Sequence, residues 1–284
     1  MFDLICTVRN CGLPLTLNSG LKCDSGHHFD RAKSGYWNLT QPQDKKSLNP
    51  GDADEAVDAR HEWLALGYGT GLTEAIRPWL SDTHLGHDTA GNKAGRQSKR
   101  VLDLGCGEGT FGNELFDSPD YSYCGIDLSK KAIKLAASRF KQQTWVMANA
   151  DRLLPVADNS VHWIVSLFGR RPIAEIKRAL CADGKCIIAI PGQHDLLELR
   201  QLVQEEGKLR NRWQPIVDEF AAEGMELVEK SSWKTQVDLT PTNATLALRM
   251  TYRAVRNSQQ QRLSQMPEKL DVTLEADLLL MQKS

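Results

Sequence analysis

One short segment, an apolar strand that runs into three closely spaced glycines, constrains the fold more than any other. Residues 100–109 read Arg-Val-Leu-Asp-Leu-Gly-Cys-Gly-Glu-Gly, and residues 111–116 have the pattern of a following helix. Glycine lets the backbone approach a ligand closely. The spacing is neither the Gly-x-Gly-x-x-Gly of dinucleotide sites nor a triphosphate loop with Gly-Lys-Ser/Thr. It favours a nucleoside with a compact zwitterionic tail, whose charged groups can meet Asp103, backbone N–H groups and the helix N-terminus.

An acidic residue at the end of the next predicted strand strengthens this interpretation. Asp127 lies 22 residues beyond Gly105 and ends the predicted strand 123–127. A carboxylate there can accept hydrogen bonds from both hydroxyls of a ribose. The alternative is a glycine turn followed by an aspartate that only caps a helix. The occurrence of both elements in register favours the nucleoside site.

A third polar segment, Ala148-Asn-Ala-Asp151, follows the predicted strand 144–148. It resembles the segment of class I methyltransferases in which an acidic side chain meets the adenine amino group. Asn149 takes that place here, and Asp151 follows two positions later. An amide can also bind the adenine edge, so both residues remain candidates.

Strands and helices alternate from residue 100 onward, which implies a parallel sheet covered on both faces. Weaker patterns predict a helix before Gly224, a strand near 225–237, a helix after Pro241 and a last strand near 270–280. We therefore expect an α/β fold of the class I methyltransferase type, with a Rossmann-like, mostly parallel, seven-stranded sheet. The remaining predicted strands cover 161–168 and 186–190, and the predicted helices cover 129–140 and 173–180.

We expect four regions along the chain. Residues 1–40 are rich in Cys, Gly and His and too few to bury a core of their own, which is typical of a metal-stabilised module. Residues 41–80 form a helical linker segment, residues 81–99 a flexible loop, and residues 100–284 the methyltransferase domain.

Composition narrows the functional class. The formal net charge is −1, so attraction to nucleic acid would depend on local basic patches. No apolar run approaches the roughly 20 residues that cross a bilayer, and the first residues lack the pattern of a secretory signal. Seven cysteines, an odd number, favour a reducing compartment. We expect a cytoplasmic protein without a membrane partner.

The N-terminal cysteines have the spacing of metal ligands. Cys6, Cys11, Cys23 and His27 follow the pattern Cys-x4-Cys-x11-Cys-x3-His, and such pairs can close a tetrahedron around zinc. His28 is an alternative to His27. No fifth ligand is evident, which favours a structural zinc site. The other four cysteines lie in apolar contexts typical of core residues.

The combination resembles the bacterial 23S rRNA guanine-N1 methyltransferases, the RlmA family. The likeness spans most of residues 6–200. It implies transfer of a methyl group from S-adenosylmethionine to N1 of a guanine in a 23S rRNA hairpin loop, with a homodimer as one form of assembly. The segments that carry it, besides the cysteine motif and the glycine loop, are His27–Asp30, Ala32–Leu39, Pro50–Ala53, Ala59-Arg60, Pro191-Gly192, His194 and Glu198-Leu199.

The glycine loop and this resemblance together define the candidate methyl-donor site. The candidate donor-binding residues are Tyr68, Asp103, Gly105, Gly107, Glu108, Asp127, Leu128, Asn149, Ala150 and His194. The family's donor-side histidine aligns with Asp195, and His194 stands beside it. The chain departs from the family pattern at three places. It has Phe168-Gly-Arg-Arg171 where the family has an aromatic-x-Pro segment, and Met250-Thr-Tyr-Arg253 where the family has Met-Thr-Pro-Phe. Its first cysteine pair is also more widely spaced.

Methylation at guanine N1 sets chemical requirements. N1 carries a proton at neutral pH, so a general base is needed within hydrogen-bond reach, and the base must be unpaired because pairing hides that edge. Asp195, His194 and Asp103 are the titratable candidates, and none is assigned. Phe168 could stack on a flipped base while Arg170 and Arg171 hold phosphates; the alternative is that the two arginines only begin a helix.

Further basic clusters are candidate RNA contacts, although each is more often a solvated surface. They are Lys45-Lys46, Lys93/Arg96/Lys99/Arg100 and Lys208/Arg210/Arg212. Two other functions are compatible with the sequence. One is methylation of another RNA base or of a small molecule, and the other is non-catalytic binding of S-adenosylmethionine or RNA.

Overall fold

The computed structural model describes residues 2–44, 51–81, 98–204, 211–250 and 261–284. Its main sheet has eight strands in the order β10-β11-β9-β8-β5-β6-β7-β4. Five central strands run parallel to one another, and β11 and β10 are antiparallel at one edge. These strands are β5 (Lys99–Leu104), β6 (Tyr121–Asp127), β7 (Thr144–Met147), β8 (Val161–Leu167), β9 (Leu180–Pro191), β10 (Met225–Leu239) and β11 (Leu270–Lys283).

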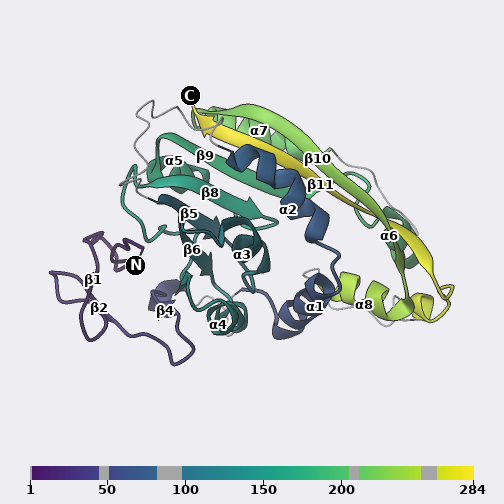
Figure 1. The fold of residues 1–284 in the computed structure, drawn as a ribbon, viewed down its shortest axis with the longest axis horizontal. Coiled ribbons are helices and arrows are strands. Elements are labelled where there is room, and N and C mark those ends of the chain that lie inside the picture. The colour runs from purple at the N-terminus through teal and green to yellow at the C-terminus, as the bar shows by residue number, and fades with distance from the viewer. Residues whose placement is uncertain (1, 45–50, 82–97, 205–210, 251–260) are drawn as a thin grey trace.

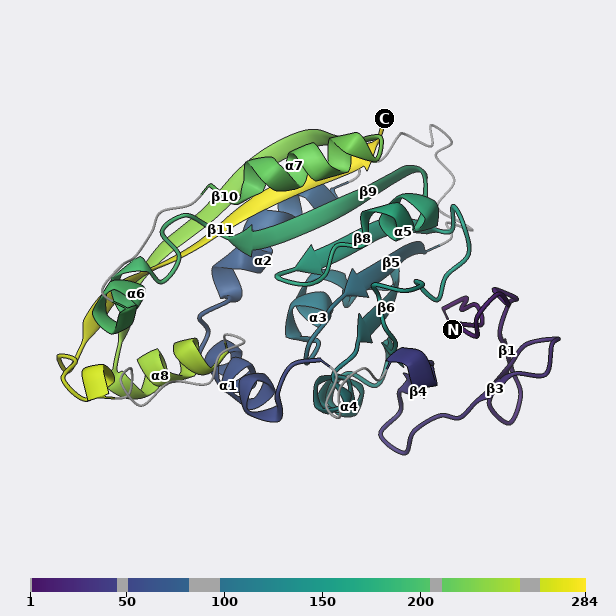
Figure 2. The same ribbon diagram turned by 180° about the vertical axis from the view of Figure 1, so that it is seen from behind.

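Helices cover both faces of this sheet, as the alternating pattern predicts. Figure 1 shows α2 (Thr70–Ile76), α3 (Thr110–Phe116) and α4 (Lys130–Arg139) on one face. Figure 2 shows α5 (Ile173–Ala179) and α7 (Trp213–Ala222) on the other. Each face has its own buried cluster of apolar side chains. The central strands are mostly hydrophobic because both of their faces are buried.

The long pair β10 and β11 continues beyond the other strands and carries a third apolar cluster. This cluster joins the ends of the two strands to α1 (Asp54–Ala65), α6 (Leu197–Gln204) and α8 (Pro241–Arg249). Thr240 caps α8 by accepting a hydrogen bond from the Asn243 amide at 3.3 Å. The predicted strand near 225–237, helix after Pro241 and last strand near 270–280 are confirmed.

The N-terminal module contributes to the main sheet. It holds three two-residue strands of its own, and its fourth, β4 (Trp37–Asn38), pairs in parallel with β7. The eighth strand of the sheet therefore comes from the cysteine-rich region, beside the seven strands expected of the methyltransferase fold. The module's own strands are β1 (Thr16–Leu17), β2 (Leu21–Lys22) and β3 (His28–Phe29), followed by the 3-10 helix η1 (Pro42–Asp44).

Polar contacts fasten the module to the larger domain. Arg152, in the loop after β7, donates to both carboxylate oxygens of the buried Asp44, at 2.7 and 3.3 Å, and to the Thr7 carbonyl at 3.0 Å. The Ile5 amide donates to the Pro155 carbonyl at 3.0 Å. Cys6 and Cys23 belong to the same buried cluster as the core of β5 and β6. The module and the methyltransferase fold are thus packed as one core.

Two predicted segments, 41–80 and 81–99, join the N-terminal module to the methyltransferase fold. The predicted loop 81–99 falls almost entirely outside the described residues. The predicted linker 41–80 contains α1, α2 and the 3-10 helix η2 (Arg77–Leu80). Within the described residues no helix is both long and apolar enough to cross a membrane.

Candidate functional site

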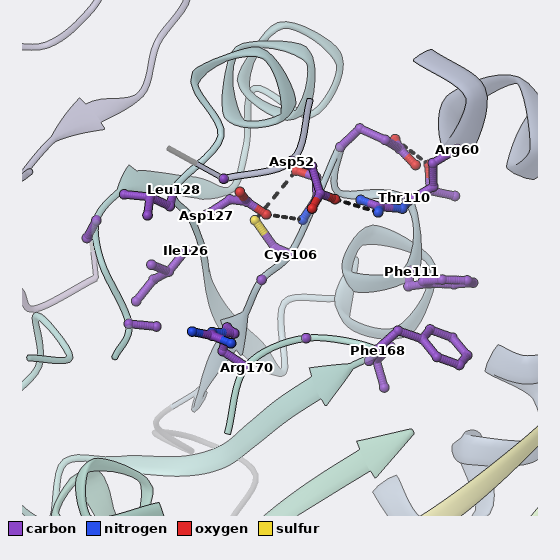
Figure 3. Close-up of a pocket in the computed structure, with 18 of the residues that line it drawn as sticks. Asp52, Arg60, Cys106, Thr110, Phe111, Ile126, Asp127, Leu128, Phe168 and Arg170 are labelled. Carbon is purple, nitrogen blue, oxygen red and sulfur yellow. Dashed lines mark hydrogen bonds and ion pairs between the residues drawn. The ribbon is translucent and has the colours of Figure 1, made fainter. Parts of the chain in front are cut away.

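A cavity of about 380 Å³ opens at the carboxyl ends of β5, β6, β7 and β8 (Figure 3). Ligands of open α/β sheets bind at this edge, where strand order reverses. The cavity is lined by residues 51–52, 60, 64, 105–108, 110–111, 126–128, 148–151 and 167–170. Seven of the predicted donor-binding residues belong to this lining, namely Gly105, Gly107, Glu108, Asp127, Leu128, Asn149 and Ala150.

The glycine loop has the backbone that only glycine adopts easily. Gly105, Gly107 and Gly109 have φ values of 72°, 58° and 84°. A Cβ atom on Gly109 would also lie 2.5 Å from the ring of Trp145, so this position is closed to any side chain. The loop turns directly into α3, which begins at Thr110. This backbone forms the floor of the cavity without side chains that would obstruct a ligand.

Asp127 ends β6 and holds the loop through its carboxylate. One oxygen accepts a hydrogen bond from the Gly107 amide at 2.9 Å, and the other accepts one from the Ser129 amide at 2.7 Å. Burial raises the pKa of Asp127, and these two backbone hydrogen bonds oppose that rise. Each carboxylate oxygen has a second acceptor direction. The arrangement is chemically suited to accept the two hydroxyls of a ribose.

The segment after β7 forms the neighbouring wall. Asn149 accepts a hydrogen bond from the Asp151 amide at 3.0 Å, and its side-chain nitrogen lies 3.5 Å from a carboxylate oxygen of Asp44. Ala148 and Ala150 present small side chains on either side. This wall of the cavity thus combines small side chains with an amide group.

Three predicted donor-binding residues lie outside the cavity lining. Tyr68 stacks on Trp63 with ring centroids 4.0 Å apart and accepts a hydrogen bond from Asn243 at 2.9 Å. His194 bonds to Glu275 through its amide and Nδ1, at 2.7 and 2.9 Å. Tyr68 therefore engages α1 and α8, and His194 engages β11, elements that the sequence alone does not place relative to the glycine loop.

Asp103 is the third residue outside the lining, and it lies buried just before the glycine loop. Its Oδ2 accepts a hydrogen bond from the Tyr123 hydroxyl at 2.6 Å, and its Oδ1 has no partner among the described residues. Burial, more than any other cause, raises its pKa to about 7. A buried carboxyl oxygen without a donor is the kind of atom that an ammonium group satisfies.

The remaining general-base candidate, Asp195, is also absent from the lining. It accepts a hydrogen bond from the Glu275 amide at 3.1 Å, and burial raises its pKa to about 6. Glu108 does line the cavity, but its carboxylate is paired with Arg139 and accepts from the Thr110 hydroxyl at 2.8 Å. These contacts give Asp195 and Glu108 structural partners within the chain.

The cavity is also lined by residues that the sequence did not indicate as donor-binding. Asp52, Arg60 and Leu64 come from the segment that enters and forms α1, and they line the cavity opposite the sheet. Phe111, on α3, lies on the same side of the close-up as Phe168 (Figure 3). Asp52 belongs to the Pro50–Ala53 motif and Arg60 to the Ala59-Arg60 motif. The sequence shows these motifs but not that they lie beside the glycine loop.

The loop after β8 faces the cavity with strained backbone. Phe168 has φ of 60°, which is unfavourable for a bulky residue, and its side chain is 42% exposed. Gly169 packs so closely on β5 that a Cβ atom there would lie 2.2 Å from the Leu104 carbonyl. Arg170 and Arg171 precede α5, whose first residue is Ile173. The two arginines therefore do not begin the helix.

The four predicted metal ligands lie together in the N-terminal module. The ligand atoms of Cys6, Cys11, Cys23 and His27 are all within 4.8 Å of one another. The Cys11 and Cys23 sulfurs are 3.8 Å apart, and Nδ1 of His27 is 3.4 Å from the sulfurs of both Cys6 and Cys23. A tetrahedron with Zn–S bonds of about 2.3 Å has edges of about 3.8 Å. The donor set fits zinc.

The rival histidine has a different environment. Nδ1 of His28 lies 3.5 Å from Asp30, and its ring packs on Gly20, where a Cβ atom would lie 2.5 Å from Nε2.

Burial is the main cause that raises the pKa of Cys6 to about 12, with neighbouring thiols adding to it. A bound divalent cation would reverse this preference by stabilising the thiolate.

Comparison with known proteins agrees with this architecture. Family models match a methyltransferase domain at residues 101–184 and the RlmA N-terminal zinc ribbon at residues 5–48. YxjB of Bacillus subtilis, which carries the provisional name 23S rRNA (guanine-N(1)-)-methyltransferase, is 30% identical over 211 residues, 72% of this chain and 70% of that protein. The 23S rRNA (guanine(748)-N(1))-methyltransferase of Streptomyces fradiae is 29% identical over 227 residues, 76% of this chain and 75% of that protein.

The strand order and the cavity at the carboxyl ends of the parallel strands define an S-adenosylmethionine-dependent methyltransferase of class I. With its N-terminal zinc ribbon and its similarity to YxjB, the chain belongs to the RlmA family. The resemblance predicted from the sequence is thereby confirmed.

Proposed function

We propose that this enzyme transfers a methyl group from S-adenosylmethionine to N1 of a guanine in 23S ribosomal RNA. The names of its relatives specify that reaction for those proteins. The observation in this chain that supports it best is Phe168, an exposed aromatic side chain that lines the donor cavity on a strained loop. Strain of this kind is retained where the surrounding structure requires it, and it clusters at functional sites.

The acceptor side suits an unpaired purine next to phosphates. A flipped base can stack on Phe168, and such stacking contributes about 1–3 kcal/mol per base. Arg170 and Arg171 follow directly and are placed to bind flanking phosphates. A guanine in a hairpin loop meets the chemical requirement, because its N1 edge is free of Watson–Crick pairing.

The donor site in this proposal is the cavity of Figure 3. Asp127 accepts the ribose hydroxyls, Asn149 and Ala150 contact the adenine, and the backbone of Gly105 and Gly107 supports the methionine part. The partnerless oxygen of Asp103 accepts the donor's ammonium group. Because the sulfonium methyl group is already electrophilic, holding donor and acceptor in line supplies much of the rate enhancement.

The module at residues 1–40 is proposed to bind zinc through Cys6, Cys11, Cys23 and His27. The rest of the chain is proposed to comprise a helical linker segment at 41–80, a loop at 81–99 and the methyltransferase domain at 100–284. Residues of the segment 51–65 also contribute to the donor cavity. Bound zinc would stabilise the module, which in turn supplies β4 to the main sheet. A cytoplasmic location, expected from the cysteine usage, and a homodimer remain predictions.

The described basic clusters do not contribute equally to this site. Lys99 and Arg100 begin β5, whereas the cavity lies beyond its other end, and Arg100 pairs with Asp3 at 2.8 Å. Residues 45–46, 93–96, 208–210 and 251–253 lie outside the described residues. We therefore assign the RNA contacts to Arg170 and Arg171, which follow the cavity-lining Phe168 in the loop after β8.

The decisive experiment incubates the protein with labelled S-adenosylmethionine and 23S rRNA that lacks the modification, then maps the label by nuclease digestion and mass spectrometry. The proposal expects one labelled 1-methylguanosine per rRNA. Label on another base would contradict the assigned position. Label on small molecules only, or none at all while the donor binds, would refute the RNA methyltransferase assignment.

A further inference from the structure

We infer that Arg60 binds the carboxylate of the methionine part of S-adenosylmethionine, and that Asp52 holds the guanidinium group in position. The inference rests on the donor site and needs no assumption about the RNA acceptor. It places a cofactor contact in the segment before the glycine loop, some 45 residues upstream of the loop itself.

The path of the chain brings this segment to the cavity. Gly51, with φ of 92°, packs so closely on the start of α4 that a Cβ atom would lie 2.6 Å from the Ser129 amide nitrogen. α1 then begins at Asp54, and an ion pair between Asp58 and Lys131 ties it to α4. The residues between these anchor points are therefore held against the end of β6.

Arg60 lies over the glycine loop. Its Nη2 donates a hydrogen bond to Asp52 at 2.5 Å, and its Nη1 would lie 3.5 Å from a Cβ atom on Gly107. Nη1 has no hydrogen-bond partner in the part of the chain that the structure describes. The side chain is 30% exposed, so it is neither buried in the core nor free in solvent. One edge of the guanidinium is thus fixed, and the other is directed to the cavity.

Four of the five loop amides are already engaged within the chain, so few backbone donors remain for the carboxylate of the methyl donor. The amides of residues 105 and 106 donate to the Ile126 carbonyl at 2.9 and 3.0 Å, and that of Gly109 donates to the Cys106 carbonyl at 3.1 Å. The Gly107 amide donates to Asp127. A carboxylate bound near this loop is therefore held more strongly where a cationic side chain adds to the amides of Glu108 and of the start of α3.

The charges around the cavity single out Arg60. The cationic side chains in the described lining are those of Arg60 and Arg170. The backbone of Arg170 also lies beside Gly105, but its guanidinium is engaged by Asp151 through Nε and Nη2. The guanidinium of Arg60 lies beside the glycine loop, where the methionine part belongs. Its planar fork can bind a carboxylate with two donors while the opposite edge stays on Asp52.

Comparing the binding of S-adenosylmethionine, its decarboxylated form and methylthioadenosine distinguishes the proposed carboxylate contact from the other contacts that S-adenosylmethionine makes. Decarboxylated S-adenosylmethionine lacks only the carboxylate, and methylthioadenosine lacks the entire amino-acid part. Isothermal calorimetry on the full chain should show that Arg60→Met weakens binding of S-adenosylmethionine about ten- to hundred-fold. Binding of the other two ligands should change by less than about twofold, because neither makes the contact.

The same measurement tests the positioning role of Asp52. Asp52→Asn should weaken binding of S-adenosylmethionine about two- to tenfold, since the guanidinium remains but loses its charged anchor. It should leave methylthioadenosine binding unchanged. Arg60→Lys should recover part of the affinity lost in Arg60→Met, because it restores the charge without the planar fork.

Matched variants control for general damage to the cavity. Arg170→Met removes the other lining arginine and should not discriminate between S-adenosylmethionine and its decarboxylated form. Asp127→Ala should weaken all three ligands, because they share the ribose. Equal weakening of all three by Arg60→Met, or no weakening of any, would overturn the inference. If wild-type protein binds S-adenosylmethionine but methylates no rRNA, the proposed function is refuted. The role of Arg60 can still be tested in that case, because the test measures only ligand binding.

Discussion

Arg170 donates hydrogen bonds from Nε and Nη2 to one carboxylate oxygen of Asp151, at 2.8 and 2.6 Å. The pair joins the loop after β8 to the loop after β7, and both residues line the donor cavity. The two side chains are 71% and 43% exposed, and ion pairs this exposed contribute little to stability. The contact instead holds a cationic group at a defined place on the proposed acceptor side.

Replacing Arg170 with Ala should therefore separate RNA affinity from stability. The unfolding free energy should change by less than about 1 kcal/mol. The slope of log affinity for rRNA against log salt should decrease by about 0.7–0.9, the value for one lost phosphate contact. Lys134→Ala, an exposed change on α4, is the control and should leave the slope unchanged. An unaltered slope for Arg170→Ala would remove this residue from the RNA site.

Two substitutions of Phe168 test the meaning of its backbone strain. Phe168→Gly and Phe168→Ala should both slow rRNA methylation about 5- to 150-fold through loss of base stacking worth about 1–3 kcal/mol. The glycine variant should be about 1 kcal/mol more stable than the alanine variant, because only glycine adopts positive φ without cost. Chemical denaturation and single-turnover methylation measure the two effects. Normal methylation in both variants would contradict the stacking role.

Zinc should support the donor site as well as the N-terminal module. Cys23→Ser should release the metal, and elemental analysis should fall from about one zinc per chain to none. Because β4 pairs with β7, and Leu39 donates to the Met147 carbonyl at 2.9 Å, loss of the module should also weaken donor binding near Asn149. Calorimetry with S-adenosylhomocysteine checks this. Unchanged affinity in zinc-free protein would show that the two parts are independent.

The stability of the donor-free protein should depend on the protonation of Asp103. Its pKa is raised from 3.8 to about 7, mainly by burial, so the folded chain keeps a proton that the unfolded chain loses. The unfolding free energy should therefore decrease as pH rises from about 4 to about 7, by roughly 1–4 kcal/mol.

Asp103→Asn should remove this part of the pH dependence, because the amide does not ionise. Asp195, whose pKa is raised to about 6, gives a decrease in the same direction that persists in the variant. Urea denaturation of both proteins across this pH range measures the difference. Parallel curves for wild type and Asp103→Asn would show that Asp103 is ionised in the folded state.

Local patterns in the sequence predicted the fold class, the glycine loop, a carboxylate at the end of β6 beside that loop and the cysteine cluster. Each depends on residues close together in the chain, or on a spacing that a strand and a turn translate directly into position. Gly-x-Gly-x-Gly permits the positive φ that all three glycines adopt here, and two ligands four residues apart need only one turn to share a metal.

Only the tertiary structure decided which distant segments share the cavity. Arg60 and Asp52 reach the glycine loop because α1 is tied to α4, and β4 joins the main sheet because Trp37 pairs with Val146. His194 and Tyr68, by contrast, are held by Glu275 and Asn243 outside the lining. Such contacts depend on how helices pack on a finished sheet. Periodicity shows that a helix has an apolar face, but not which surface that face meets.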